Sequence, residues 1–354
     1  MRFQKAEQVL RNEIEQGNLP GACLEIGNAK GTIERVVLGN RALVPQVLPL
    51  EEDTLFDMAS CTKMMATSMV LFHMIEEGKI CLNDRLGRFY EGLRPEVAEI
   101  TIWNLLTHTS GIRPLTSCVG SAREDVDKDI LNMPLAFKRG TAVGYACLAY
   151  IVLGRLLERL NGKRLDEMAD EWFYQPMGMK STCFCPKSDN IAYTDINKKT
   201  GEVSIGVVND YNARALGGIV GNAGLFSNLH DCSTFARMLL NEGEHEGKRI
   251  LSPAMIRMAR TNQTPGLPAY ENSHFSTARG LGMYMACAPL NPPAELLSPN
   301  AFGHTGHTGT GVFVDPDNGI YVVLLTSRLH LLDNSGEDIW RVRRLVHNAI
   351  AAEL

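Results

Sequence analysis

The stretch Ser60-Cys61-Thr62-Lys63 places a potential nucleophile and a potential proton acceptor one helical turn apart. A serine hydroxyl is a poor nucleophile at neutral pH and needs a nearby base. On a helix, Lys63 would lie on the same face as Ser60, and burial would favour its neutral form. A helix beginning at Ser60 would also direct free N–H groups toward an anionic intermediate. Because chance alone supplies about one S-x-x-K motif in a chain of this size, the surrounding sequence has to support this interpretation.

The residue pattern predicts strands at both ends of the chain and helices between them. Residues 62–77 are apolar on most sides and end before Gly78, which predicts a buried helix. Residues 261–300 are rich in Pro and Asn and predict surface loops. Further elements are predicted over 2–16 (helix), 21–28 and 32–39 (strands), 101–107, 148–160, 231–241 and 250–260 (helices), 311–314 and 320–327 (a hairpin) and 336–351 (helix).

This order of elements predicts an α/β (α+β) fold in which both chain ends contribute to one antiparallel sheet flanked by helices. We expect residues 1–76 and 216–354 to form the sheet domain, with residues 77–215 inserted as a mainly helical domain. The active site is expected in the cleft between the two, a common location for sites that bind small molecules.

Composition excludes several classes of protein. A formal net charge of −5 and a pI near 6.0 leave no basic stripe, so nucleic acid is not an expected partner. The N-terminus lacks an apolar signal-peptide core, and no segment is long and apolar enough for a membrane, so no membrane partner is expected. Nine cysteines without framework spacing read as reduced thiols and predict a cytoplasmic protein.

Three further segments can contribute to a site around Ser60. In GTAVGYAC (140–147), Tyr145 stands where a loop meets a helix, and it can act as a base or a relay if cations lower its pKa. The glycines of FGHTGHTGTG (302–311) let a backbone N–H approach a ligand and complete an oxyanion hole. ALGGIVGNAGLFS (215–227) lacks the lysine and the preceding strand of a phosphate-binding loop.

Taken together, these segments resemble the serine β-lactamase and penicillin-binding-protein superfamily, in its branch of class C-like β-lactamases, esterases and D-amino-acid peptidases. TLFDMASCTK (54–63) is similar to the nucleophile motif with its lead-in, and IWNLLTHTSG (102–111) is similar to the LLTHTSG segment. Residues 215–227 resemble the glycine-rich GLFS segment, and residues 302–328 resemble the final motif with its strand pair. The resemblance covers most of the chain and implies a β-lactamase-like fold.

The resemblance also implies catalytic roles. Ser60 would attack a carbonyl and carry the acyl group, and Lys63 would help to deprotonate it. Tyr145 would work with Lys63 as a base, and as an acid toward the leaving group. The backbone N–H groups of Ser60 and His307 would form the oxyanion hole.

Substrate-binding groups are implied at His304-Thr305-Gly306 and at Cys147, where the sequence departs from the family pattern. His304 stands where many relatives have a lysine, and a histidine is only partly charged near neutrality. Cys147 replaces the asparagine of the Y-x-N motif, and a thiol holds an amide carbonyl less well than an amide donor does. Ala146 replaces the usual serine, and both changes argue against an efficient β-lactamase.

Neither a metal nor an organic cofactor is expected. Cys183 and Cys185 lack a second ligand pair at zinc spacing, and no HExxH motif occurs. His108 is interpreted as a residue that caps or braces a helix end, and Cys61 as an inert thiol packed beneath the site.

The sequence therefore predicts a serine hydrolase that forms an acyl-enzyme on a small ester or amide, as a β-lactamase-related esterase. The alternative is a D-amino-acid peptidase or amidase, or a carboxypeptidase that acts on cell-wall fragments. A β-lactamase ranks below these, and a non-catalytic ligand sensor ranks last because Ser60 and Lys63 are both present. The sequence leaves the oligomeric state open.

Overall fold

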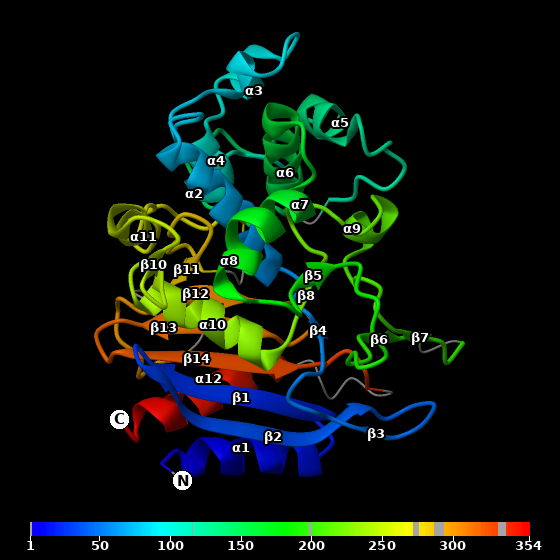
Figure 1. Ribbon diagram of the computed structural model, residues 1–354. Helices are drawn as coiled ribbons and strands as arrows, with labels where there is room; N and C mark the ends of the chain where they lie inside the picture. The colour runs from blue at the N-terminus through cyan, green and yellow to red at the C-terminus, as the bar shows by residue number, and fades with distance from the viewer. Residues whose placement is uncertain (1, 115, 198–199, 272–275, 287–293, 332–337) are drawn as a thin grey trace.

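A seven-stranded antiparallel sheet forms the base of the molecule (Figure 1). The computed structural model describes residues 2–114, 116–197, 200–271, 276–286, 294–331 and 338–354. In spatial order the strands are β11 (Tyr284–Met285), β12 (Phe302–Thr305), β13 (Gly311–Asp315), β14 (Ile320–Thr326), β1 (Gly21–Asn28), β2 (Gly31–Ala42) and β3 (Leu48–Pro49). Because β14 pairs with β1, with Ala22 opposite Thr326, the two chain ends build one sheet, as predicted.

Alternation along the central strands gives the sheet two buried faces. Successive side chains of a strand point to opposite sides. Leu24 and Leu324 belong to one apolar cluster, whereas Cys23 and Leu325 belong to another on the opposite face. The centre of the sheet is therefore covered on both sides by other elements.

Helices from the two chain ends cover one face, and a helix from the middle of the chain covers the other (Figure 1). On the first face, α1 (Gln4–Glu15) packs against α12 (Ile339–Ala351), and both contribute to the cluster that contains Leu24. On the second face, α10 (Leu229–Leu240) crosses β14, β1 and β13. The predicted sheet with flanking helices is confirmed.

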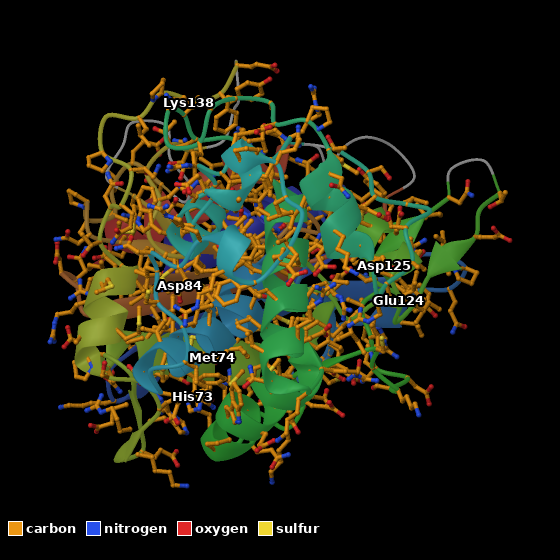
Figure 2. All side chains as sticks on the ribbon, turned by 90° about the horizontal axis from the view of Figure 1, so that it is seen from above. His73, Met74, Asp84, Glu124, Asp125 and Lys138 are labelled. Carbon is orange, nitrogen blue, oxygen red and sulfur yellow. The ribbon has the colours of Figure 1, made fainter. Side chains whose placement is uncertain are left out.

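The remaining helices form a layer above the sheet (Figure 1), and the view from above shows Asp84, Glu124 and Lys138 spread over its outer surface (Figure 2). No helix within the described ranges is long and apolar enough to cross a membrane. The helices of this part are a π-helical turn (Lys63–Ser68), α2 (Met69–Glu76), a 3-10 turn (Leu86–Arg88), α3 (Pro95–Ala98), α4 (Ile102–Leu106), α5 (Val126–Asn132), α6 (Cys147–Asn161), α7 (Leu165–Ala169), a second π-helical turn (Asp170–Tyr174), α8 (Gln175–Met177), α9 (Tyr211–Ala215) and α11 (Pro253–Ala259).

A small three-stranded sheet places the nucleophile motif beside the glycine-rich segment. Its strands run in the order β4 (Phe56–Asp57), β8 (Leu225–Ser227) and β5 (Cys183–Phe184), and Asp57 pairs with Phe226. Two further strand pairs are β6 (Asp195–Ile196) with β7 (Val203–Ser204), and β9 (Glu244–His245) with β10 (Lys248–Arg249).

The structure differs from the sequence predictions in two places that bear on the site. The predicted buried helix after Ser60 forms, but residues Lys63–Ser68 are π-helical, a wider turn that is frequent at functional sites. The prediction of surface loops over 261–300 is wrong at β11, a buried pair of residues that hydrogen-bonds to β12. A two-residue strand is too short to show a periodicity. Residues 272–275 and 287–293 of this range lie outside the described residues.

The domain boundaries at 76/77 and 215/216 stay predictions. The sequence prediction places the helix after Ser60 in the sheet domain, whereas in the structure this helix packs against α6 and α7 of the helical layer. One continuous buried cluster contains residues of this helix, of α6 and of β13 and β14, so the core does not divide at these positions. The eight cysteines in the described ranges are all free, and Cys287 lies outside them.

Helix α6 and the glycine-rich segment touch backbone to backbone. Gly154 on α6 and Gly221 face each other so closely that a Cβ atom at Gly221 would clash with the carbonyl oxygen of Tyr150 and would lie 3.1 Å from the backbone nitrogen of Gly154. Thr67 adds a hydrogen bond of 2.7 Å from its hydroxyl to the carbonyl oxygen of Gly221. These contacts determine where the following residue, Asn222, presents its carbonyl group.

We therefore expect Gly221→Ala to destabilise the protein and to reduce its hydrolytic activity. Overpacking at such a contact costs about 1–3 kcal/mol, and relief of the clash would move the carbonyl group of Asn222. Urea denaturation measures the free energy of unfolding. A Gly221→Ala protein that unfolds at the same urea midpoint as wild type and keeps full activity would show that the contact is looser than the structure indicates.

Candidate active site

The backbone at the nucleophile is held in a sharp turn. Ala59, directly before Ser60, has φ 44°, a left-handed conformation that is uncommon for a residue with a side chain. The Asp57 carboxylate accepts a hydrogen bond of 2.8 Å from the N–H of Ala59 and one of 2.7 Å from the N–H of Asn209. This turn leaves Ser60 partly exposed although its neighbours are buried.

Lys63 lies beneath Ser60 and is completely buried. Its Nζ atom lies 3.0 Å from Ser60 Oγ and 2.9 Å from the carbonyl oxygen of Asn222. The same Nζ lies 3.5 Å from Cys147 Sγ, at the first residue of α6. The sequence prediction that Lys63 lies within reach of Ser60 is therefore met by the geometry, and the wider π-helical turn begins at Lys63 itself.

Tyr145 reaches Ser60 from the other side of the site. Its phenol is hydrogen-bonded to Ser60, and its ring lies 5.1 Å from Lys63 Nζ and 5.2 Å from the guanidinium carbon of Arg279. Burial raises the pKa of Tyr145 well above 10, although the hydrogen bond to Ser60 and the charge of Arg279 act in the opposite direction. A neutral phenol, which can donate a proton, is therefore the resting form, and the condition set for a basic Tyr145, a pKa lowered by cations, is not met.

His108, in the segment that resembles LLTHTSG, lies against Tyr145 as well as next to the end of α4, where the sequence predicts only a brace for the helix end. Its ring lies 4.5 Å from the ring of Tyr145, and its Nδ1 accepts a hydrogen bond of 3.2 Å from the N–H of Ala146. Burial lowers the pKa of His108 well below 6.5, and the charges of Arg279 and Lys63 act in the same direction. His108 is thus a neutral acceptor that orients the residues flanking Tyr145.

The end of β12 closes the site opposite Tyr145. A Cβ atom at Gly306 would clash with the Thr310 hydroxyl and would lie 2.6 Å from the carbonyl oxygen of Met58, so only glycine fits against the nucleophile turn. His304 is 1% exposed, and its Nδ1 lies 2.8 Å from the carbonyl oxygen of Thr305. Burial, reinforced by the charge of Lys63, lowers the pKa of His304 well below 6.5, so it carries no charge at neutral pH.

The oxyanion hole expected from the backbone N–H groups of Ser60 and His307 stays a prediction. Among the described residues, the backbone N–H of neither Ser60 nor His307 donates a hydrogen bond. Arg343 on α12 donates 2.6 Å and 2.9 Å hydrogen bonds to the carbonyl oxygens of Gly306 and Thr310, which fixes the turn that carries His307. Arg328 donates to the carbonyl oxygen of His307 at 2.7 Å.

Sequence reasoning missed three contributors to the site. Asn222 acts through its backbone, which no side-chain motif reveals, and Asp57 acts by holding a turn. Arg279 lies in the range read as a surface loop, yet it is 1% exposed and stacks near Tyr145. The Gly280-Leu281-Gly282 sequence after Arg279 was the available signal for a close backbone approach. Cys61 is buried, as predicted, and burial raises its pKa to about 12.

Comparisons with known proteins agree with this site. A family model described as Beta-lactamase matches residues 6–347. The chain belongs to the beta-lactamase family. A protein of Escherichia coli (strain K12) named "Putative D-alanyl-D-alanine carboxypeptidase" is 30% identical over 323 residues, which cover 81% of this chain and 72% of that protein.

Solved structures show the same fold. EstCE1, described as a hydrolase with promiscuous acyltransferase activity, superimposes with a TM-score of 0.76 at 22% identity, covering 97% of this chain and 98% of its own. The octameric penicillin-binding protein homologue from Pyrococcus abyssi gives a TM-score of 0.74 at 22% identity, covering 92% of this chain and 74% of its own. The predicted superfamily, fold class and general activity, a serine hydrolase, are confirmed by these relationships. Within the described ranges, no group of three His, Cys, Asp or Glu residues is arranged to hold a metal ion.

The buried Asp57 generates a prediction on pH and stability. Burial raises the pKa of this carboxyl from 3.8 to about 6, so the folded protein binds the proton more tightly than the unfolded chain does. The contribution to the free energy of unfolding is then fully present below pH 3.8 and is lost as the pH rises through about 6. A pKa difference of this size corresponds to about 3 kcal/mol.

We expect wild-type stability, measured by urea denaturation, to contain this fall between about pH 4 and about pH 7, and Asp57→Asn to lack it. Asp53→Asn, at an exposed acid four residues earlier, is the matched control and should keep the wild-type pH dependence. An Asp57→Asn protein with the same pH dependence as wild type would contradict the assignment.

Proposed function

We propose that the protein is a carboxylesterase-type serine hydrolase that forms an acyl-enzyme at Ser60. The observation that carries the proposal is the contact of Ser60 Oγ with two groups, the buried amine of Lys63 at 3.0 Å and the phenol of Tyr145. The N–H groups of Ser60 and His307, which donate to no group in the described part of the chain, support an oxyanion hole beside that hydroxyl. His304, Thr305, Gly306 and Cys147 are proposed to line the substrate.

In the proposed acylation, Ser60 Oγ bonds to the substrate carbonyl carbon while the free amine of Lys63 takes its proton, and Lys63 passes that proton to Tyr145 as Tyr145 gives up its own. The bond from the carbonyl carbon to the leaving atom breaks, and that atom takes a proton from Tyr145. The net result is transfer of the Ser60 proton to the leaving group, with Lys63 and Tyr145 in their starting states. Water then releases the acid by the reverse proton path.

Three variants test these roles. Ser60→Ala should remove covalent labelling by a fluorophosphonate, and Tyr145→Phe should lower kcat about 10²–10⁴-fold, as expected for loss of a proton donor. Lys63→Met should lower kcat by a similar factor, because it removes the group that accepts the Ser60 proton. Mass spectrometry locates the adduct on the wild-type protein. A fluorophosphonate adduct on another residue, or none, would refute Ser60 as the nucleophile.

The second candidate is a D-amino-acid peptidase or amidase, and the relative named "Putative D-alanyl-D-alanine carboxypeptidase" supports it. The residues around the acyl group favour an ester instead. Cys147 offers only a weak donor where an amide would hold an acyl-amide carbonyl, and its sulfur is already in contact with Lys63. His304 is buried and neutral, so it supplies no charge for a substrate carboxylate.

This comparison predicts that Cys147→Asn increases kcat/KM for an amide such as D-alanyl p-nitroanilide relative to p-nitrophenyl acetate. A restored amide–carbonyl hydrogen bond is worth about 1 kcal/mol, or roughly fivefold. Cys147→Ser is the matched control, because it removes the thiol without adding the amide. An unchanged ratio in Cys147→Asn would show that residue 147 does not select between amides and esters.

A further inference from the structure

Arg279 is a buried cation without a counter-ion among the described residues. Its side chain is 1% exposed, and its Nε and Nη2 atoms have no hydrogen-bond partner within the described ranges. Burying an unpaired charge is costly, so such a residue does not serve the stability of the fold. Arg279 lies beside Tyr145, which points to a role in the active site.

The guanidinium lies against the two tyrosines nearest to the reacting atoms. Its central carbon is 4.0 Å from the ring centroid of Tyr284 and 5.2 Å from that of Tyr145. Lys63 Nζ, which becomes cationic when it takes the Ser60 proton, lies 5.1 Å from the same Tyr145 ring. A cation attracts the face of an aromatic ring, and it attracts a phenolate more strongly because the ring then carries a full negative charge.

The backbone around Arg279 holds this charge in place. The N–H of Arg279 donates to Thr264 Oγ1 at 3.0 Å, and its carbonyl accepts from the N–H of Gln263 at 2.6 Å. At Gly282, a Cβ atom would clash with the hydroxyl of Ser68 on the π-helical turn, so the loop packs tightly against the helix that carries Lys63. A charge fixed before the reaction stabilises a developing charge without reorganisation.

The other groups facing Tyr145 cannot supply this charge. They are His108 from the loop after α4, Cys147 and Tyr150 from α6, Tyr284 from β11 and His304 from β12. Burial keeps both histidines neutral because it lowers their pKa values well below 6.5. Among the described residues, Arg279 is therefore the cationic side chain, apart from Lys63, that lies close to Tyr145.

We propose that Arg279 is a positioning residue whose fixed charge stabilises Tyr145 as it gives its proton to the leaving group, so that the enzyme suits esters of ordinary, weakly acidic alcohols. This inference rests on the proposed function. When the bond between carbonyl carbon and alcohol oxygen breaks, that oxygen takes the phenolic proton and Tyr145 becomes transiently anionic. The proton from Ser60 then restores the phenol. An activated alcohol such as p-nitrophenol leaves without that proton and gains little from Arg279.

The test compares two esters that share an acetyl group, benzyl acetate and p-nitrophenyl acetate, in the wild-type protein and in variants. Because both give the same acyl-enzyme, their kcat/KM values report acylation alone. We expect Arg279→Gln to lower the ratio of benzyl to p-nitrophenyl acetate by about tenfold or more, with Arg279→Lys recovering part of it. Arg257→Gln, at a surface arginine paired with Glu242 at 2.6 Å, should keep the wild-type ratio.

A double-mutant cycle separates this role from a structural one. In a Tyr145→Phe background, Arg279→Gln should change the ratio no further, because the group it acts through is gone. An unchanged ratio in Arg279→Gln would overturn the inference, and so would an equal fall of the ratio in the wild-type and Tyr145→Phe backgrounds. In either case, covalent labelling of Ser60 by the fluorophosphonate would leave the proposed function standing. If Tyr145→Phe itself left the ratio unchanged, the proton-donor role of Tyr145 would fail, and the inference with it.

Discussion

The buried amine of Lys63, held between the hydroxyl of Ser60 and the carbonyl of Asn222, is the contact on which the site depends. A charged or polar amine without water needs partners at short range, and here the chain supplies them from two segments far apart in the sequence. The carbonyl of Asn222 is available because Gly221 packs against α6 without a side chain. The core therefore fixes the position of the amine, and the amine fixes the environment of the nucleophile.

Close backbone contacts bring the other parts of the site to Ser60. The end of β12 reaches the nucleophile turn through Gly306, and Arg343 ties that end of the strand to α12 on the far side of the sheet. The Asp57 carboxylate holds the turn before Ser60 from within the protein. A shift of any of these elements would move the backbone N–H groups of Ser60 and His307 relative to the serine hydroxyl, and the proposed oxyanion hole would work only at short, defined distances.

Charge in the site is unequally distributed among its titratable groups. Burial keeps His108 and His304 neutral and makes Tyr145 a resting phenol, since it lowers the pKa values of the histidines and raises that of the tyrosine. The groups that can carry positive charge are Arg279 and Lys63, and they lie about equally far from the Tyr145 ring. Such a site favours negative charge that develops on the phenol and on the substrate oxygen, which is the pattern of acyl transfer to serine.

The sequence by itself determined the superfamily, the sheet built from both chain ends and the spacing of Ser60 and Lys63, because each depends on local periodicity or on an ordered motif. It also predicted Tyr145 and His307 as members of the site; in the structure Tyr145 is hydrogen-bonded to Ser60, and the glycine before His307 packs against the turn before Ser60. Only the tertiary structure decided the protonation state of Tyr145 and the part played by His108, Asn222 and Arg279. Those properties arise from burial and from contacts between distant segments, and desolvation and Coulomb energies depend on distances in space that residue order does not contain.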